Sequence, residues 1–255
     1  MKKIFLTLFI IILLLVLNNI YNNDVKRIIY RLYQNGNGNI QTGDLQYRIN
    51  FMGVIPAGEA TFAKEKVEEY DGRQVYHLTA TARNLPIFSK FFKSYASVDS
   101  YIDMQQLSPV LFRQKLVVTG RDDLNREIAY DQKEGIMSIA GVRRQILPDT
   151  QDPLSAIFNI RRMDFAQVKE FDLNINTNQK NYLLKGIAYP KDISINNKTY
   201  RIVLLRAEIS RRDKNPYHKS KITMVLLKQK EGSIPIFIKV FASGALINVR
   251  LVEIK

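Results

Sequence analysis

The sequence of 255 residues contains no cysteine and only two histidines. Without cysteine, disulfide bonds, thiolate metal sites and cysteine nucleophiles are excluded. The two histidines, His77 and His218, do not form an H-x-x-x-H or H-x-E motif, so zinc would need carboxylates for most of its ligands. A serine hydrolase is not indicated either, because no G-x-S-x-G motif is present. The residues therefore predict no catalytic centre, no metal site and no cofactor.

The sequence also lacks acidic residues relative to basic ones, and its formal net charge is +14. Such a charge is compatible with nucleic-acid binding, but the export signal described below argues against a nucleic-acid partner. A codon bias toward Lys, Ile and Asn explains the charge more simply, and attraction to anionic envelope surfaces is a further explanation. The densest basic region is a predicted hairpin over residues 201–221, which we interpret as solvated rather than as a site for lipid phosphate or an anionic glycan.

Long apolar runs are absent except at the N-terminus, where two lysines precede a run over residues 4–17. This run is shorter than the about 20 residues of a typical membrane-spanning helix, and no A-x-A-like cleavage site follows it. We favour an uncleaved signal anchor over residues 1–23. It would hold the chain to the inner membrane through residues 4–21, facing the periplasm. The alternative is a periplasmic protein after signal cleavage. Residues 24–43 are expected to be a linker.

Strand patterns occupy most of the remaining sequence. Leu45, Tyr47, Ile49 and Phe51 alternate with polar residues, which is typical of a half-buried strand. Similar segments recur about every 10–15 residues with turn signals between them, a pattern that favours an antiparallel sandwich, roll or barrel. The further strands are expected at 59–67, 74–82, 94–103, 110–119, 125–131, 136–140, 170–176, 181–188, 200–210, 221–228, 235–241 and 245–254.

Three short signals refine this pattern. Asp71-Gly72 predicts a hairpin turn, and Gly58 predicts a bulge or a close backbone approach. Asp152-Pro153 predicts the start of a helix over about 153–162, because Asp is a good N-cap and Pro is favoured at the first helical position. We therefore predict one all-β domain over 44–255. Its fold is a strongly curved antiparallel sheet, an open barrel or roll, with one short helix, in addition to the N-terminal signal-anchor helix.

An aromatic loop lies between two of these strands, within the stretch Thr79–Phe112. Ile87, Phe88, Phe91 and Phe92 occur there on closely spaced positions. We predict that these four side chains cover one end of the curved sheet and border its interior. A mobile lid over a ligand is the alternative.

The strand after this loop carries two carboxylates on one face, because Asp99, Tyr101 and Asp103 alternate with period two. Four residues of strand span about 13 Å, whereas the carboxylates of glycosidases lie roughly 5–9.5 Å apart. We therefore interpret these acids as partners of arginines or caps of turns.

Five stretches together match a known family: Gly53–Phe62, Thr81–Phe112, Tyr130-Asp131, Leu147–Arg161 and Ile234–Leu251. In them the chain resembles the bacterial domain-of-unknown-function family 3108, a group of exported envelope proteins. One departure concerns Lys228–Ser233, where other members have an aspartate-rich turn before the Ile-Pro strand. The resemblance implies an all-β exported domain and no particular reaction, since the family has no agreed activity.

Two functions of different classes remain open. The first is a non-enzymatic binding or assembly module for a lipophilic or anionic envelope component, with an envelope lipid or an envelope protein as partner. The second is a carboxylate-dependent envelope glycan hydrolase. The candidate ligand-binding residues are Phe88, Phe91, Phe92, Asp99, Tyr101, Asp103 and Arg161.

Overall fold

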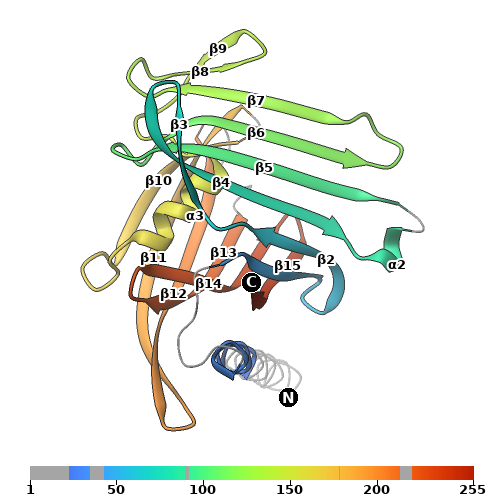
Figure 1. Cartoon of the computed structure of the whole chain (residues 1–255), viewed down its shortest axis with the longest axis vertical. Helices are drawn as coiled ribbons and strands as arrows, with labels where there is room; N and C mark the ends of the chain where they lie inside the picture. Colours follow the sequence, from blue (N-terminus) through green and yellow to red (C-terminus); the bar gives the residue numbers. More distant parts are fainter. Residues whose placement is uncertain (1–22, 35–42, 90–91, 178, 213–219) are drawn as a thin grey trace, which may run out of the picture.

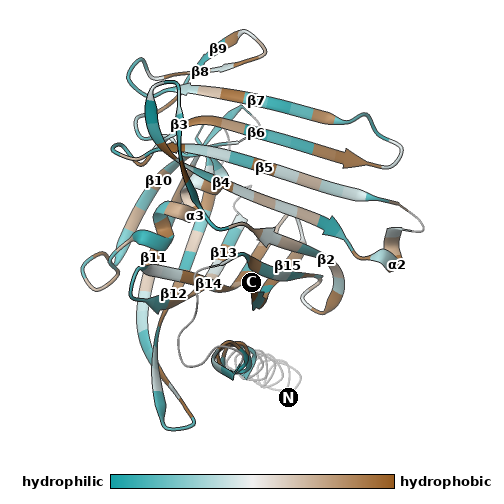
Figure 2. Cartoon of the chain, in the orientation of Figure 1, coloured by the Kyte–Doolittle hydropathy of each residue, from teal (hydrophilic) through white to brown (hydrophobic). Residues whose placement is uncertain are grey.

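A computed structural model of the chain describes residues 23–34, 43–89, 92–177, 179–212 and 220–255 (Figure 1). Its strands form one sheet of fifteen strands in which neighbours are antiparallel, as predicted. The long strands alternate between hydrophilic and hydrophobic residues along their length (Figure 2). The strands are β1 (Leu45–Phe51), β2 (Ile55–Phe62), β3 (Lys66–Tyr70), β4 (Arg73–Asn84), β5 (Ser94–Asp103), β6 (Pro109–Val118), β7 (Leu124–Asp131), β8 (Ile136–Ile139), β9 (Val142–Gln145), β10 (Glu170–Thr177), β11 (Lys180–Ile195), β12 (Lys198–Arg211), β13 (Ser220–Gln229), β14 (Gly232–Ala242) and β15 (Ala245–Ile254).

The strand order is β10-β11-β12-β13-β14-β15-β1-β2-β4-β5-β6-β7-β8-β9, with β3 beside β4. Most neighbours are consecutive hairpins, and the pairing of β1 with β15 joins the first strand to the last. The sheet is open within the described residues, with β10 and β9 at its edges. A single parallel bridge between Gln151 and Ile175 attaches the segment before the main helix to the edge strand β10.

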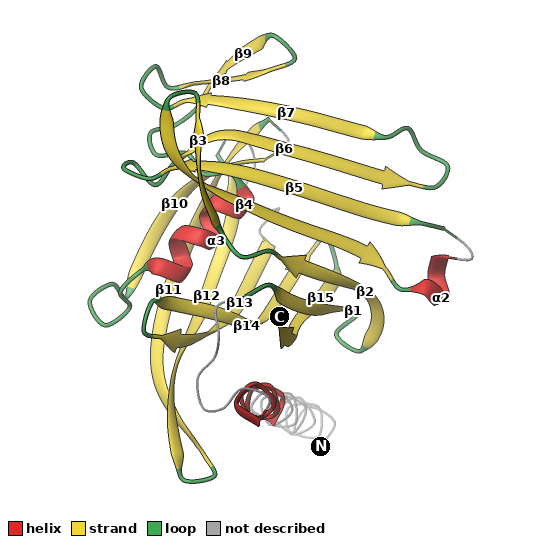
Figure 3. Cartoon of the chain, viewed as in Figure 1, coloured by secondary structure: helices red, strands yellow, loops and turns green. Residues whose placement is uncertain are grey.

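Helix α3 (Pro153–Arg162) has the predicted bounds and lies between the two halves of the folded sheet (Figure 3). Asp152 is its N-cap and accepts hydrogen bonds from the backbone of Leu154 and Ser155. Leu154 and Phe158 pack with residues of β4 and β5. Ala156 and Ile160 pack with residues of β10 to β13. Because α3 presents apolar side chains to both halves, it holds them around a common interior.

A second helical segment covers residues 23–34, where we expected the start of a linker. Val25, Ile28 and Ile29 are buried among residues of β1, β12, β13, β14 and β15, so this part of the predicted linker packs on the core. Val25 and Ile29 recur at helical spacing, and the sequence over 24–30 is compatible with a helix, but its packing on the core was not predicted. No helix of the described residues is long and apolar enough to cross a membrane. The predicted signal anchor lies, except for its last residue, outside the described residues.

The sheet separates locally between β14 and β15. These strands pair from Phe237 and Arg250 to Ala242 and Ala245, while the first residues of β14 pair only with β13. Tyr47 of β1 crosses this separation, and its buried hydroxyl donates a 2.8 Å hydrogen bond to the carbonyl of Pro235. Burial raises the pKa of the Tyr47 phenol, so the group stays a neutral donor. The separation is therefore filled by an aromatic side chain rather than by a strand.

Several local expectations are confirmed and two are corrected. Asp71 and Gly72 form the β3–β4 turn, and Gly58 lies at a bulge where an added Cβ would approach the Arg83 carbonyl oxygen to 2.6 Å. The strand expected over 59–67 is instead divided between β2 and β3. Strand β9 was not predicted, because all four of its residues are exposed and show no alternation.

Candidate functional site

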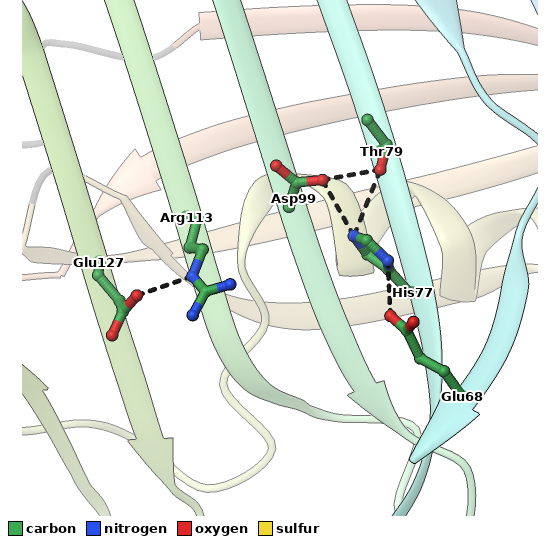
Figure 4. A network of polar contacts seen from close by, with 6 residues as sticks. All are labelled: Glu68, His77, Thr79, Asp99, Arg113 and Glu127. Carbon is green, nitrogen blue, oxygen red and sulfur yellow. Dashed lines mark hydrogen bonds and ion pairs between the residues drawn. The ribbon is translucent and has the colours of Figure 1, made fainter. Parts of the chain in front are cut away.

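A network of polar side chains lies on the outer face of β4, β5, β6 and β7 (Figure 4). Its centre is His77, whose Nδ1 is 2.6 Å from Glu68 and whose Nε2 is 3.0 Å from Asp99. Thr79 donates a further hydrogen bond of 2.7 Å to the same oxygen of Asp99. The network therefore ties the peripheral strand β3 to β4 and β5.

The aromatic part of this network follows from the strand register. Tyr101 is the cross-strand partner of His77, and the two rings stack with centroids 4.2 Å apart. Arg113 lies over the Tyr101 ring and pairs with Glu127 at 2.7 Å. Burial raises the pKa of Tyr101, so its phenol is not an activated nucleophile. Directly opposed residues of an antiparallel pair are expected to interact in this way.

The predicted site residues of β5 thus have different surroundings. Asp99 and Tyr101 belong to the network, whereas Asp103 caps the β5–β6 turn by accepting hydrogen bonds from the amides of Gln105 and Gln106. This agrees with our interpretation of Asp103 as a turn cap, and Asp99 pairs with a histidine rather than with an arginine. Binding of a ligand by these residues stays a prediction.

Arg161 lies elsewhere, near the end of α3. Its Nε donates a 3.1 Å hydrogen bond to the carbonyl of Ser233, and its Nη1 is 3.9 Å from Glu65. The structure therefore does not bring Arg161 together with the network on the outer face, and its contacts join α3 to the start of β14.

The aromatic loop differs most from expectation. Helix α2 (Pro86–Ser89) is a single turn that follows β4. Ile87 is 66% exposed and Phe92 is 45% exposed, so the prediction that they cover the sheet interior is wrong for both. Phe88 is half-buried, and Phe91 lies outside the described residues. The physical reason is that Asn84 bonds both Phe92 and the residue after the loop, which holds this short turn beyond the end of the sheet.

A buried polar contact was not foreseen. Ser100, on the inner face of β5, donates a 2.6 Å hydrogen bond to Asp152. The capping role of Asp152 is confirmed, but its partner is 52 positions away in the sequence. Burial raises the pKa of Asp152, and the hydrogen bonds from Ser100, Ser155 and Leu154 oppose this shift.

A groove lies at the end of β11, β12 and β13, beside the loop that follows α3. Its first part has a volume of about 310 Å³ and includes the buried side chains of Phe165 and Val203 together with Pro190. Its second part, of about 480 Å³, is polar and is lined in addition by Thr199, Gln229 and Lys230. Both parts share Asp192, Arg201 and Lys228, and we call them together the β11–β13 groove.

The charges of this groove are mainly positive. Lys191, Arg201, Lys228 and Lys230 line it, and the acids among its lining residues are Asp164 and Asp192. Asp192 is paired with Arg201 at 3.2 Å. Of this groove, the sequence analysis singled out only the lysine-containing turn at 228–233, without predicting a site there.

No group of His, Cys, Asp and Glu in the described ranges is arranged to hold a metal ion. The fold and these sites together define an all-β protein with an open, barrel-like antiparallel sheet around one central helix. The chain belongs to the family described as protein of unknown function (DUF3108), whose model matches residues 46–247. This confirms the family resemblance recognised in the sequence.

A solved structure has a similar fold. The beta-barrel-like protein of domain of unknown function DUF1849 from Brucella abortus aligns with a TM-score of 0.57 and 9% sequence identity. The alignment covers 82% of this chain and 95% of that chain. At this identity the likeness concerns the fold alone. The comparison with curated proteins found no match.

Proposed function

We propose that the chain is a non-enzymatic binding module of the cell envelope that takes an amphipathic, anionic ligand such as an envelope lipid. The observation that carries this proposal is the β11–β13 groove, in which an apolar floor meets a cationic rim. Phe165, Pro190 and Val203 offer apolar contact, while Arg201 and Lys228 border both parts of the groove. A ligand with a short apolar portion and an anionic headgroup matches this division.

The local charge supports an anion over a neutral lipid. Four basic side chains and two acids line the groove. Arg201 already pairs with Asp192, whereas Lys191, Lys228 and Lys230 form no ion pair with the described residues. Ammonium groups attract phosphate as point charges, whereas a zwitterionic headgroup would gain less from them.

The contacts of the carboxylates in the outer-face network do not favour the alternative function, a glycan hydrolase. A glycan hydrolase needs one carboxyl group facing the sugar and a second facing a water or the anomeric carbon. The imidazole of His77 contacts both Glu68 and Asp99 and so lies between these two carboxylates. Asp103 accepts two turn amides. These carboxylates are engaged in holding strands and turns.

The cellular location in this proposal is inferred from the sequence. The N-terminal lysines and the apolar run over residues 4–17 favour export, with the inner membrane holding the chain through residues 4–21 and the described residues in the periplasm. Cleavage of the segment would leave the same binding module free in the periplasm. Fractionation and the mass of the mature chain distinguish these two forms.

Native mass spectrometry of the purified full chain tests the binding proposal. The chain is mixed with short-chain phosphatidylglycerol or with phosphatidylcholine of the same chain length. We expect a one-to-one complex with phosphatidylglycerol that Lys228→Glu weakens at least about tenfold, since reversing a contacting charge removes an attraction and adds a repulsion. Lys115→Glu is the control, because Lys115 is also exposed but lies on β6 and does not line the groove. Equal binding of the two lipids, or equal loss in both variants, would refute the proposal.

A further inference from the structure

A second surface, separate from the groove, lies at one end of the sheet. Three connections meet there: the β1–β2 turn, the β4–β5 connection that contains α2, and the β14–β15 turn. Large apolar side chains exposed at or beside these connections include Met52, Val54, Ile55, Ile87, Phe92 and Phe241. We call these six residues the turn rim.

Hydrogen bonds and register show that these connections are neighbours. Asn248 of β15 donates a 3.1 Å hydrogen bond to the carbonyl of Gly53, which joins the β15 strand to the β1–β2 turn. Leu85, just before α2, donates a 3.1 Å hydrogen bond to Ala57 of β2. The strands that carry the rim, from β14 through β15, β1, β2 and β4 to β5, are consecutive in the sheet. Five steps of about 4.8 Å place the outer tips about 24 Å apart along the sheet.

Other described residues leave these apolar side chains largely uncovered. Val54 is 74% exposed and Ile87 is 66% exposed. Single exposed apolar residues are ordinary on protein surfaces, but a contiguous set on adjacent turns indicates an interaction site.

Two lysines lie beside the rim. Lys93 follows Phe92 directly, and Lys221 is the cross-strand partner of Phe241; both lysines are exposed. The turn segments 51–56, 85–93 and 241–246 contain no Asp or Glu. Glu208 of β12 is the cross-strand partner of Lys221, and Asp122 and Asp123 lie in the β6–β7 turn, on the far side of β5 from the other rim connections.

We propose that the turn rim docks on an anionic phospholipid bilayer. In this contact the apolar tips enter the interface between headgroups and acyl chains, while Lys93 and Lys221 lie at the level of the anionic headgroups. Apolar side chains flanked by basic ones are the combination that binds such membranes. A second copy of the chain fits less well, because a symmetric contact would bring Lys93 of both copies together without acids from the three turn segments.

The absence of cysteine allows a direct test on the full chain. Val54→Cys, labelled with an environment-sensitive fluorophore, is reconstituted in phosphatidylcholine vesicles with or without phosphatidylglycerol. We expect a blue shift and quenching by doxyl-labelled lipid in the vesicles that contain phosphatidylglycerol. Val142→Cys is the matched control, since Val142 is also exposed but belongs to the edge strand β9. Its fluorescence should not change. Because any predicted N-terminal anchor is present in both proteins, it cannot produce the difference between them.

Three results would overturn the proposal. The first is an unchanged Val54 label in both kinds of vesicle, and the second is an equal shift of both labels. The third is a shift of the Val54 label that depends on protein concentration in the absence of vesicles, which would indicate a second copy as the occupant. Lys93→Glu combined with Lys221→Glu should abolish the shift. Lys228→Glu should leave the fluorescence shift unchanged, because Lys228 lines the groove and not the rim. The membrane-docking proposal and the lipid-binding proposal can therefore fail independently of each other.

Discussion

The Ser100 hydroxyl donates a 2.6 Å hydrogen bond to the carboxylate of Asp152, and neither residue is exposed to solvent. This contact joins β5 to the first turn of α3. The other oxygen of Asp152 accepts the amides of Leu154 and Ser155. One side chain therefore begins the central helix and also attaches it to the sheet. Because α3 packs against both halves of the sheet, the position of this carboxylate affects the whole interior.

Asp152→Ala should destabilise the protein by about 1.5–5 kcal/mol, because losing an N-cap costs about 0.5–2 kcal/mol and leaving a buried donor unpaired costs about 1–3 kcal/mol. Urea denaturation measures this change. Asp122→Ala is the control, since Asp122 is exposed in a turn, and its effect should stay within about 0.5 kcal/mol. Equal stability of the two variants would contradict the role assigned to Asp152.

The same carboxyl predicts an unusual pH dependence. Burial raises the pKa of Asp152 above its ordinary value of 3.8, so between 3.8 and the raised value the folded chain binds more protons than the unfolded chain. The contribution of Asp152 to stability must therefore fall as pH rises through this window and stay constant above it. Compared with Asp152→Asn, the wild-type chain should gain stability as pH is lowered from neutral through the raised pKa. A difference that instead grows with rising pH would contradict the shift.

Tyr47→Phe should destabilise the chain by about 1–3 kcal/mol, because the buried carbonyl of Pro235 loses its donor where β14 and β15 separate. Thermal or urea denaturation measures this loss. The aromatic ring is retained, so packing with Phe62 is preserved. Tyr95→Phe is the control, as Tyr95 is a partly exposed tyrosine on the surface of β5. If both variants melt alike, the hydrogen bond contributes nothing.

Ile29→Ala should cost about 2–5 kcal/mol if the segment 23–34 is part of the folded domain, because Ile29 is completely buried. Tyr30→Ala, at the exposed neighbouring position, should have a small effect. The comparison is made by urea denaturation of the full chain. A small effect of both substitutions would restore the linker originally expected over 24–43.

Much of the local structure could be predicted from the sequence, because it depends on neighbours. Asp152-Pro153 placed the start of α3 correctly, and period-two alternation placed β5 and β15 at their observed bounds. Asp71-Gly72 identified the β3–β4 turn. Strand β9 was missed for the same reason, since exposed residues have no alternation to recognise.

The candidate sites were predicted less well. Asp99 and Tyr101 were correctly assigned to one face of β5. Their common partner, His77, could not be predicted, because the alternation within one strand does not reveal which residue of β4 lies opposite; that depends on the β4–β5 register. The exposed position of Ile87 and Phe92 depends on the hydrogen bonds of Asn84 at both ends of the loop. The apolar composition of the loop predicted that Ile87 and Phe92 are buried, but the hydrogen-bonded geometry of the connection leaves both side chains exposed.

The sequence by itself determined the antiparallel all-β class, the central helix and the family, because propensity, turn chemistry and alternation are local properties of the chain. The tertiary structure decided which residues meet: Ser100 with Asp152, Tyr47 with Pro235, and Val203 with Phe165 in the groove. Residues 188 positions apart, such as Tyr47 and Pro235, come together only when the whole sheet has formed. Such contacts follow from strand register and sheet curvature, which depend on the packing of all strands around α3 rather than on any single segment.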